Sequence, residues 1–254
     1  MEWAALFSED KVVTFLFLFF RFAALFMLVP IFDHKNIPMT IKTSLALFFT
    51  FLFYPLLPPT HIEINIPTVL MGVLGELMLG LTIGVVLKIT FEIITFAGGQ
   101  ISTAMGFSMA SAMDPQSGVS NPLIASFMSL IVMMMMLSLD MHHWIILFIG
   151  DSLESIPLGG FILNKEIVDY IIKASAHMLV VGFMIAFPVY AMTFLNDLMF
   201  GMLMKTMPQF NLLVIGMPAK ITLGLIVIIV TLTSTMLIMK REIVDAFNWL
   251  EILL

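Results

Sequence analysis

The sequence predicts an all-α integral membrane protein, and three observations support this. Of the 254 residues, 61% are hydrophobic and only 11% are charged, whereas soluble domains carry about 45–50% apolar and roughly 25% charged residues. The apolar residues stand in long continuous runs. These runs do not alternate over about ten residues, as the strands of a membrane β-barrel would. Membrane lipid or partner subunits must cover the excess apolar surface, because a soluble chain of this length cannot hide it.

Six segments meet or approach the roughly 20 apolar residues that a spanning helix needs. They are residues 12–32, 41–57, 69–98, 123–149, 178–200 and 212–239. The polar stretch 151–173 leaves room for one amphipathic helix. The tail 240–254 is expected to form a short amphipathic helix, because its apolar residues recur at helical spacing. No low-complexity linker divides the chain, so residues 1–254 are expected to form a single domain.

Several ionisable residues stand inside these apolar runs, where each would cost about 2.5–3.5 kcal/mol at the centre of a lipid-facing helix. We therefore expect most of them to face protein or water. Lys88 and Glu92 are four residues apart, so they share a helix face and are expected to pair. Besides Arg21, the charged residues concerned are candidates for buried pairing between helices or subunits: Glu76, Lys88, Glu92, Asp140, Asp197 and Lys220. The alternative is a conduction or proton-relay path.

Composition and motifs argue against several other functions. The net charge of −6 disfavours nucleic acid, which selects basic patches. The chain has no cysteine and no phosphate-binding or dinucleotide-binding glycine motif, so we expect no cofactor and no catalytic residues. The adjacent His142 and His143 are expected to point about 100° apart on a helix. We therefore expect no metal site, and interpret them with Asp140 as an interfacial or subunit-contact cluster.

Two blocks interrupt the apolar pattern. Residues 98–122 read GGQISTAMGFSMASAMDPQSGVSNP, with small side chains, methionines and no Lys or Arg. This suits a re-entrant segment buried in protein or lining a cavity, where irregular backbone survives at membrane depth; the alternative is an ordinary loop. In the second block Pro208 and Pro218 are expected to break the helix, and Gln209 and Asn211 to satisfy the freed backbone groups. This block is interpreted as the tip of a helical hairpin.

The two blocks and their flanks resemble the FliR family of flagellar type III export gate proteins, which is shared with the injectisome export apparatus. The matching stretches are RFAALFMLVPIFDHKNIP, MGFSMASAMDPQSG, LDMHHWIILFIGDSLESIPLG and KTMPQFNLLVIGMPAKITLG. They follow the family's order and cover nearly the whole chain. The middle stretch looks more like the flagellar than the injectisome branch.

The resemblance implies a core subunit of the flagellar export gate in the bacterial inner membrane, at the basal body. Hydrophobic helical hairpins would pack with partner subunits into a pseudo-helical assembly. One copy would join several copies of FliP and FliQ, FlhB would associate, and unfolded flagellar substrates would pass through the pore.

The resemblance also implies particular site residues. The family's pore plug falls on Gly106, Phe107, Ser108, Met109, Ala110, Met113, Asp114 and Pro115. Relatives often carry further aromatic residues here, where this chain has Met109 and Ala112. The hairpin motif falls on Pro208, Gln209, Asn211, Gly216 and Pro218.

A small-molecule secondary transporter is the alternative function. Broken helices and charges in apolar segments fit such a carrier. It would place its binding site at an interface of internal repeats, and the two halves of this sequence show no convincing repeat. An intramembrane enzyme lacks a plausible Ser/His, diacid or metal constellation.

Overall fold

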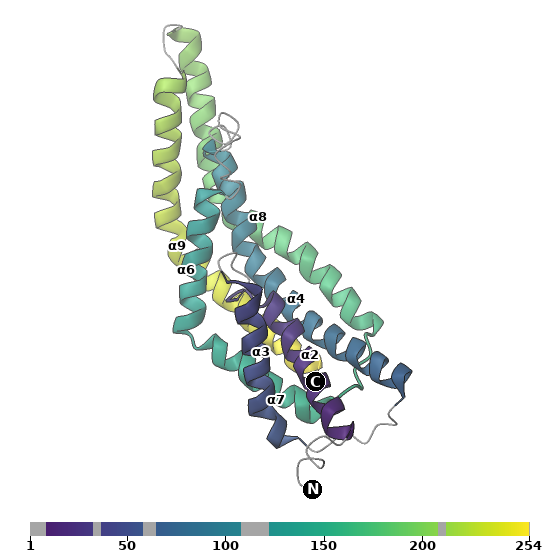
Figure 1. Ribbon diagram of the computed structural model, residues 1–254. Helices are drawn as coiled ribbons and strands as arrows, with labels where there is room; N and C mark the ends of the chain where they lie inside the picture. Colours follow the sequence, from purple (N-terminus) through teal and green to yellow (C-terminus); the bar gives the residue numbers. More distant parts are fainter. Residues whose placement is uncertain (1–8, 33–36, 58–64, 108–121, 208–211, 254) are drawn as a thin grey trace. The chain divides into compact units, whose positions relative to one another are not determined.

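A computed structural model describes residues 9–32, 37–57, 65–107, 122–207 and 212–253. Of the described residues, 89% are helical and none forms a strand. The helices are α2 (Glu9–Leu28), α3 (Met39–Phe53), η1 (Tyr54–Leu56), α4 (Ile66–Ala104), α6 (Leu123–Ser138), α7 (Met141–Ser155), α8 (Lys165–Thr206) and α9 (Leu212–Leu253) (Figure 1). Five described helices are long and apolar enough to cross a membrane, and α6 with α7 adds a sixth span if they count as one. The predicted all-α membrane protein is confirmed.

Three expectations about the helices are wrong. Residues 123–149 do not form one helix, because the chain breaks at Asp140, which has the left-handed values φ 55° and ψ 25°. Aspartate tolerates this conformation better than most residues. The tail 240–254 is no separate helix, since α9 continues to Leu253. Pro218 was expected to break the helix, but it lies inside α9, as Pro188 lies inside α8. Each proline removes a backbone hydrogen bond without ending its helix.

The chain forms two compact units, each built from separate stretches of sequence. Unit one comprises Met1–Ile89, Asp140–Ala174 and Asp245–Leu254, and unit two comprises Thr90–Leu139 and Ser175–Val244. Helices α4, α8 and α9 contribute residues to both units. The prediction of a single domain over residues 1–254 stays a prediction.

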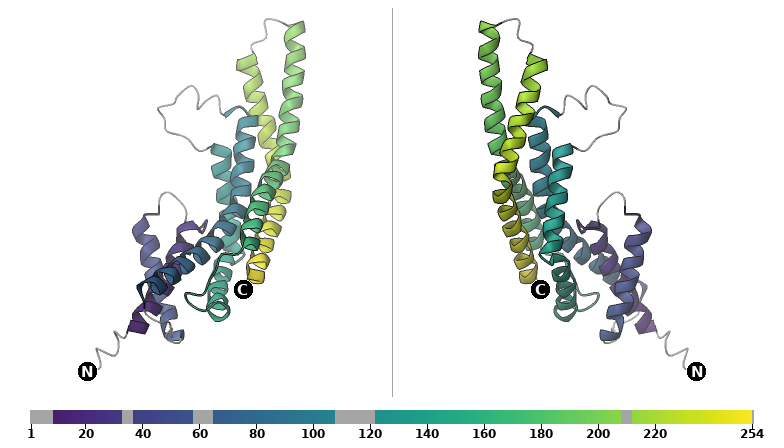
Figure 2. Two further views of the ribbon diagram at one scale, coloured as in Figure 1. Left: turned by 90° about the vertical axis from the view of Figure 1, so that its right-hand side faces the viewer. Right: turned by 90° about the vertical axis from the view of Figure 1, so that its left-hand side faces the viewer.

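In unit one, α2 and α3 lie side by side around a phenylalanine-rich core (Figures 1 and 2). Phe22 is fully buried, and its ring lies 5.5–6.1 Å from the rings of Phe26, Phe49 and Phe53. The Phe26 ring is stacked on that of Phe22 and the other two rings are tilted against it, and such aromatic pairs contribute beyond the apolar area that they bury. The first helical pair is therefore held by the aromatic residues that made these segments so apolar.

In unit two, α6, α8 and α9 each pack on the C-terminal part of α4. Gly98 of α4 lies against Ala125 of α6, and Gly182 of α8 lies against Phe96 of α4. Tyr190 of α8 donates a 2.9 Å hydrogen bond to Oε1 of Gln100. Gly224 of α9 completes the set by lying against Met105, just after α4. The end of α4 is thus the common support of this unit.

Candidate functional site

The predicted plug, called here the gate segment (residues 106–115), lies mostly outside the described residues. Gly106 and Phe107 are described, and Phe107 is half-buried. The remaining predicted plug residues, Ser108, Met109, Ala110, Met113, Asp114 and Pro115, are not. The structure therefore shows how the chain enters this block from α4 and where it re-enters a helix at α6.

The chain leaves α4 through a turn that requires glycine. Met105 is fully buried, and the amide of Gly106 donates a 3.1 Å hydrogen bond to the carbonyl of Thr103. Gly106 has φ 89°, a value that glycine adopts without the clash that a side chain would cause. A Cβ at this position would also lie 3.1 Å from the terminal methyl of Met217. The start of the gate segment is therefore set by a glycine turn against α9.

The helices on either side of the block approach each other unusually closely. A Cβ on Gly98 would lie 2.4 Å from the Cα of Ala125, so only a glycine fits there without a backbone shift. One turn earlier in α4, the Thr95 and Ser129 hydroxyl oxygens lie 3.1 Å apart in a hydrogen bond. Small residues that allow this approach are typical of helix packing in membranes. The stem formed by α4 and α6 is thus a closely packed helix pair.

A buried charged network, called here the arginine network, lies in unit one. Its members are Arg21, Glu76, Ser152, Ile156 and Gly159. Arg21 and Glu76 are 1% and 0% exposed and form a bidentate ion pair, with Nε bound to Oε2 and Nη2 lying 3.0 Å from Oε1. Sequence reasoning named Arg21 but did not find this partnership, because the two residues are 55 positions apart.

Backbone groups complete the arginine network. Nη1 of Arg21 donates to the carbonyl of Ser152 at 3.1 Å, and Nη2 to that of Ile156 at 3.3 Å. The amide of Gly159 donates to Oε1 of Glu76 at 2.7 Å. A buried ion pair is tolerated when further hydrogen bonds satisfy its remaining donors and acceptors. The network therefore fastens α2, α4, the end of α7 and the chain that follows it.

The other predicted charged residues have more exposed surroundings. Asp197 and Lys220 form an ion pair at 2.6 Å, but their side chains are 56% and 20% exposed. Asp140 is 71% exposed, since it occupies the break before α7. Burial of Asp140 and Asp197 against a partner subunit therefore stays a prediction. Lys88 and Glu92 are both half-buried in α4, and their pairing stays a prediction.

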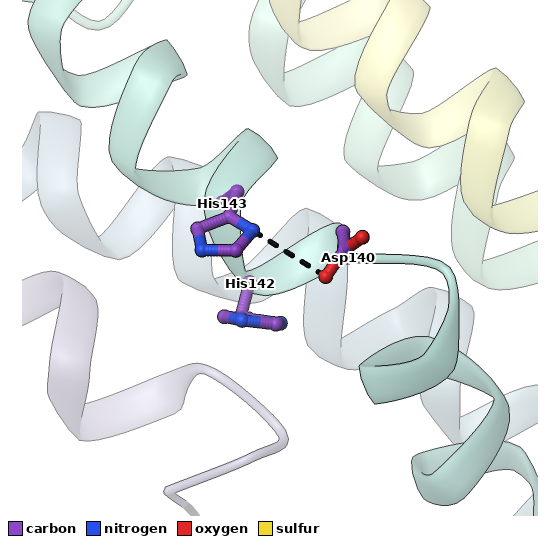
Figure 3. A group of neighbouring side chains, drawn as sticks. All are labelled: Asp140, His142 and His143. Atoms are coloured by element: carbon purple, nitrogen blue, oxygen red, sulfur yellow. Dashed lines mark ion pairs between the residues drawn. The ribbon is translucent and has the colours of Figure 1, made fainter.

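The histidines beside Asp140 lie closer together than the sequence predicts (Figure 3). The ring centroids of His142 and His143 are 4.1 Å apart, so the expected divergence of the two rings is wrong. Their ligand atoms and a carboxylate oxygen of Asp140 all lie within 4.8 Å of one another. The left-handed backbone of Asp140 brings its carboxylate back onto the first turn of α7, where both rings stand.

The predicted hairpin tip is described only on its C-terminal side. Gly216 is buried and Pro218 exposed, and both lie inside α9. The Thr222 hydroxyl donates a 2.8 Å hydrogen bond to the carbonyl of Pro218. Pro208, Gln209 and Asn211 lie outside the described residues, so their predicted part in a turn stays a prediction.

Comparisons with known proteins give a consistent result over almost the whole chain. The model of the family "Bacterial export proteins, family 1" matches residues 12–246. The flagellar biosynthetic protein FliR of Bacillus subtilis (strain 168) is 30% identical over 236 residues, covering 91% of each chain. FliR of Escherichia coli (strain K12) is 28% identical over 222 residues, covering 86% of this chain and 85% of the relative. FliR of Aquifex aeolicus (strain VF5) is 26% identical over 249 residues, covering 96% and 95%.

Proposed function

Since the chain belongs to the bacterial export proteins, family 1, as a FliR component of the flagellar export apparatus, we propose that it forms the substrate-conducting pore with FliP and FliQ. The observation that carries this proposal is that the family match runs through both units and both flanks of the gate segment. The pore would lie in the inner membrane at the basal body, with FlhB associated. Unfolded flagellar proteins are the proposed substrates, and no catalytic step is involved.

The length of the helices supports assembly with partner subunits. Helix α8 has 42 residues, which corresponds to about 63 Å of helix. Its exposed large apolar residues extend from Val168 to Met204, or about 54 Å along the helix. A hydrocarbon core of about 30 Å needs only about 39 Å of helix even at a tilt of 40°. Lipid alone therefore covers only part of this apolar face, and protein is the natural cover for the rest.

Two other helices leave most of their apolar surface uncovered. The membrane-span windows of α3 with η1 and of α9 are only 11% and 17% buried within the chain. Exposed apolar area of this extent marks a surface that contacts lipid or other proteins. The Asp197–Lys220 pair joins α8 to α9 and leaves the Asp197 side chain 56% exposed, and a charge facing lipid is costly. Contact with neighbouring subunits would remove both problems.

The gate segment is proposed to close the pore. Its sequence has small residues for close backbone packing and the bulky, deformable Phe107, Met109 and Met113. An apolar constriction of this kind holds ions back by dewetting and still yields to a passing chain. The closely packed stem of α4 and α6 supports the proposal, because a seal needs fixed attachment points.

Deletion of the gene tests the function. The proposal predicts a strain that makes no flagellar filament and secretes no flagellar substrate, while general secretion continues. Complementation with the wild-type gene controls for effects on neighbouring genes. A deletion strain that still swims would overturn the proposal.

Permeability tests the gate separately. Replacing Phe107, Met109 and Met113 together with alanine should leave the protein incorporated in its complex but make cells leak ions or small solutes. The matched control replaces Met71, Met78 and Met134, which are exposed on α4 and α6, with alanine. If the gate variant is incorporated and permeability stays at the wild-type level, the gate segment is not the seal, whereas the pore proposal stands.

The family membership also favours an export component over a small-molecule carrier. A carrier completes its binding site within one chain or a small homo-oligomer. Purification with FliP and FliQ therefore separates the two functions.

A further inference from the structure

We propose that Asp140, His142 and His143 form a binding site for a divalent transition-metal ion on the first turn of α7 (Figure 3). Two imidazoles and one carboxylate are a ligand set suited to zinc, iron, cobalt or nickel rather than to magnesium or calcium, which prefer oxygen ligands. The three residues lie within four positions of the chain and within unit one. All three ligands thus come from one short stretch of the chain.

The distances fit metal coordination. Ligand atoms held 2.0–2.2 Å from a tetrahedral zinc ion stand about 3.3–3.6 Å from one another. Nδ1 of His143 lies 3.5 Å from Oδ1 of Asp140, which is already within this range. Since all three ligand atoms lie within 4.8 Å of one another, closure requires a movement of at most about 1.5 Å. Asp140 and His143 are 71% and 62% exposed, so their side chains have room to make it.

The carboxylate of Asp140 does not cap α7. Asp140 occupies the N-cap position of α7, where aspartate commonly accepts a hydrogen bond from the helix, yet its side chain makes no capping bond. Its backbone is also in the sparsely populated left-handed region, at φ 55°. This conformation turns the carboxylate toward the histidines. A role as a metal ligand accounts for both features. The negative charge of the carboxylate also offsets the repulsion between a metal cation and the positive N-terminal end of α7.

His142 provides an independent observation. Its Nδ1 is buried and makes no hydrogen bond to any described residue, although buried polar atoms are nearly always partnered. Histidine binds a metal ion through a ring nitrogen that carries no proton. Coordination through Nδ1 would give this atom the partner that it lacks. A fourth coordination position would remain for water or for a partner's side chain.

Titration of the purified full-length protein with zinc chloride alone tests the proposal. The protein carries a purification tag without histidine, and binding is followed by calorimetry or by competition with a chromophoric chelator. We expect about one zinc ion per chain. Asp140→Gly, His142→Ala and His143→Ala should each weaken binding at least about tenfold, since even loss of an outer partner of a metal ligand costs 10–100-fold.

The controls separate loss of a ligand from loss of folding. Asp140→Gly removes the carboxylate at a position where glycine tolerates the positive φ, so its helical content should match the wild type. His177→Ala removes a histidine of unit two that lies 3.0 Å from Glu242, and it should bind zinc as the wild type does. Cobalt absorption provides a second readout, because the visible bands of coordinated Co²⁺ should vanish in Asp140→Gly and His143→Ala.

The proposal is wrong if the wild-type protein binds no zinc. It is equally wrong if Asp140→Gly and His143→Ala keep wild-type affinity, or if His177→Ala loses as much affinity as they do.

Discussion

Units one and two each carry an ion pair formed between helices, but in opposite surroundings. Arg21 and Glu76 in unit one are 1% and 0% exposed and are joined by three backbone groups. Asp197 and Lys220 in unit two are 56% and 20% exposed and meet at a single 2.6 Å contact. The difference teaches that a charge in an apolar run has no single meaning. Which helix face carries it decides whether it fastens the chain internally or is left for water or a neighbour.

The expected energies of the two pairs differ accordingly. Removing one partner of a buried pair leaves an uncompensated charge and destabilises by about 3–5 kcal/mol. Exposed pairs contribute about 0–1 kcal/mol, because solvent screens the attraction and ordering the side chains costs entropy. Stability measurements on single substitutions therefore discriminate sharply between the two regions.

The largest effect is expected at the arginine network. Arg21→Met should lower the stability of the purified protein by about 3–5 kcal/mol, because Glu76 is left buried and charged. The double variant Arg21→Met, Glu76→Met should be more stable than either single variant, since it removes both charges. Thermal or denaturant unfolding in detergent measures this. A single variant with wild-type stability would contradict the internal fastening role.

An intermediate effect on stability is expected at Gly98 of α4, which packs against α6, and its neighbour Gly99 provides a position without such a contact. Gly98→Ala should destabilise by about 1–3 kcal/mol, because its Cβ would lie 2.4 Å from the Ala125 backbone and overpacking forces a shift. Gly99→Ala is the matched control: no atom of the described residues lies within 4 Å of its Cβ position, and alanine favours helix by about 1 kcal/mol. Equal effects of the two substitutions on unfolding would show that α4 and α6 are not closely packed.

The smallest effect on the isolated chain is expected at the exposed pair. Asp197→Asn should change the unfolding free energy by less than about 1 kcal/mol. If partner subunits cover this surface, the same substitution should reduce the amount of chain recovered in the assembled complex. A loss of stability as large as that of Arg21→Met would place Asp197 inside a fold that the structure shows open.

The sequence predicted the presence of most helices but not their internal breaks. Continuous apolar runs identify helices well, because a helix that crosses the hydrocarbon core needs about 20 consecutive apolar residues. The break at Asp140 was missed because neither glycine nor proline marks it. At Pro218 the sequence predicted a break that the structure does not have, since a helix as long as α9 tolerates one missing hydrogen bond.

The candidate sites show a similar division between local and distant relationships. Pairing of Lys88 with Glu92 was proposed because helical spacing is visible in sequence. The partnership of Arg21 with Glu76 was invisible, because it depends on how helices 55 residues apart in sequence pack together. The closeness of His142 and His143 was missed for another reason: their divergence was inferred from ideal helix geometry, which gives no account of rotamers or of the left-handed residue before α7.

Purification from native membranes tests the central claim most directly. The chain is tagged at its chromosomal locus, extracted in mild detergent and purified, and its partners are quantified by mass spectrometry. A parallel purification through tagged FliP shows that the detergent preserves the apparatus. The account predicts that FliP and FliQ are recovered with this chain in a fixed ratio. Recovery of the chain alone or as a homo-oligomer, while tagged FliP still retains FliQ, would contradict it.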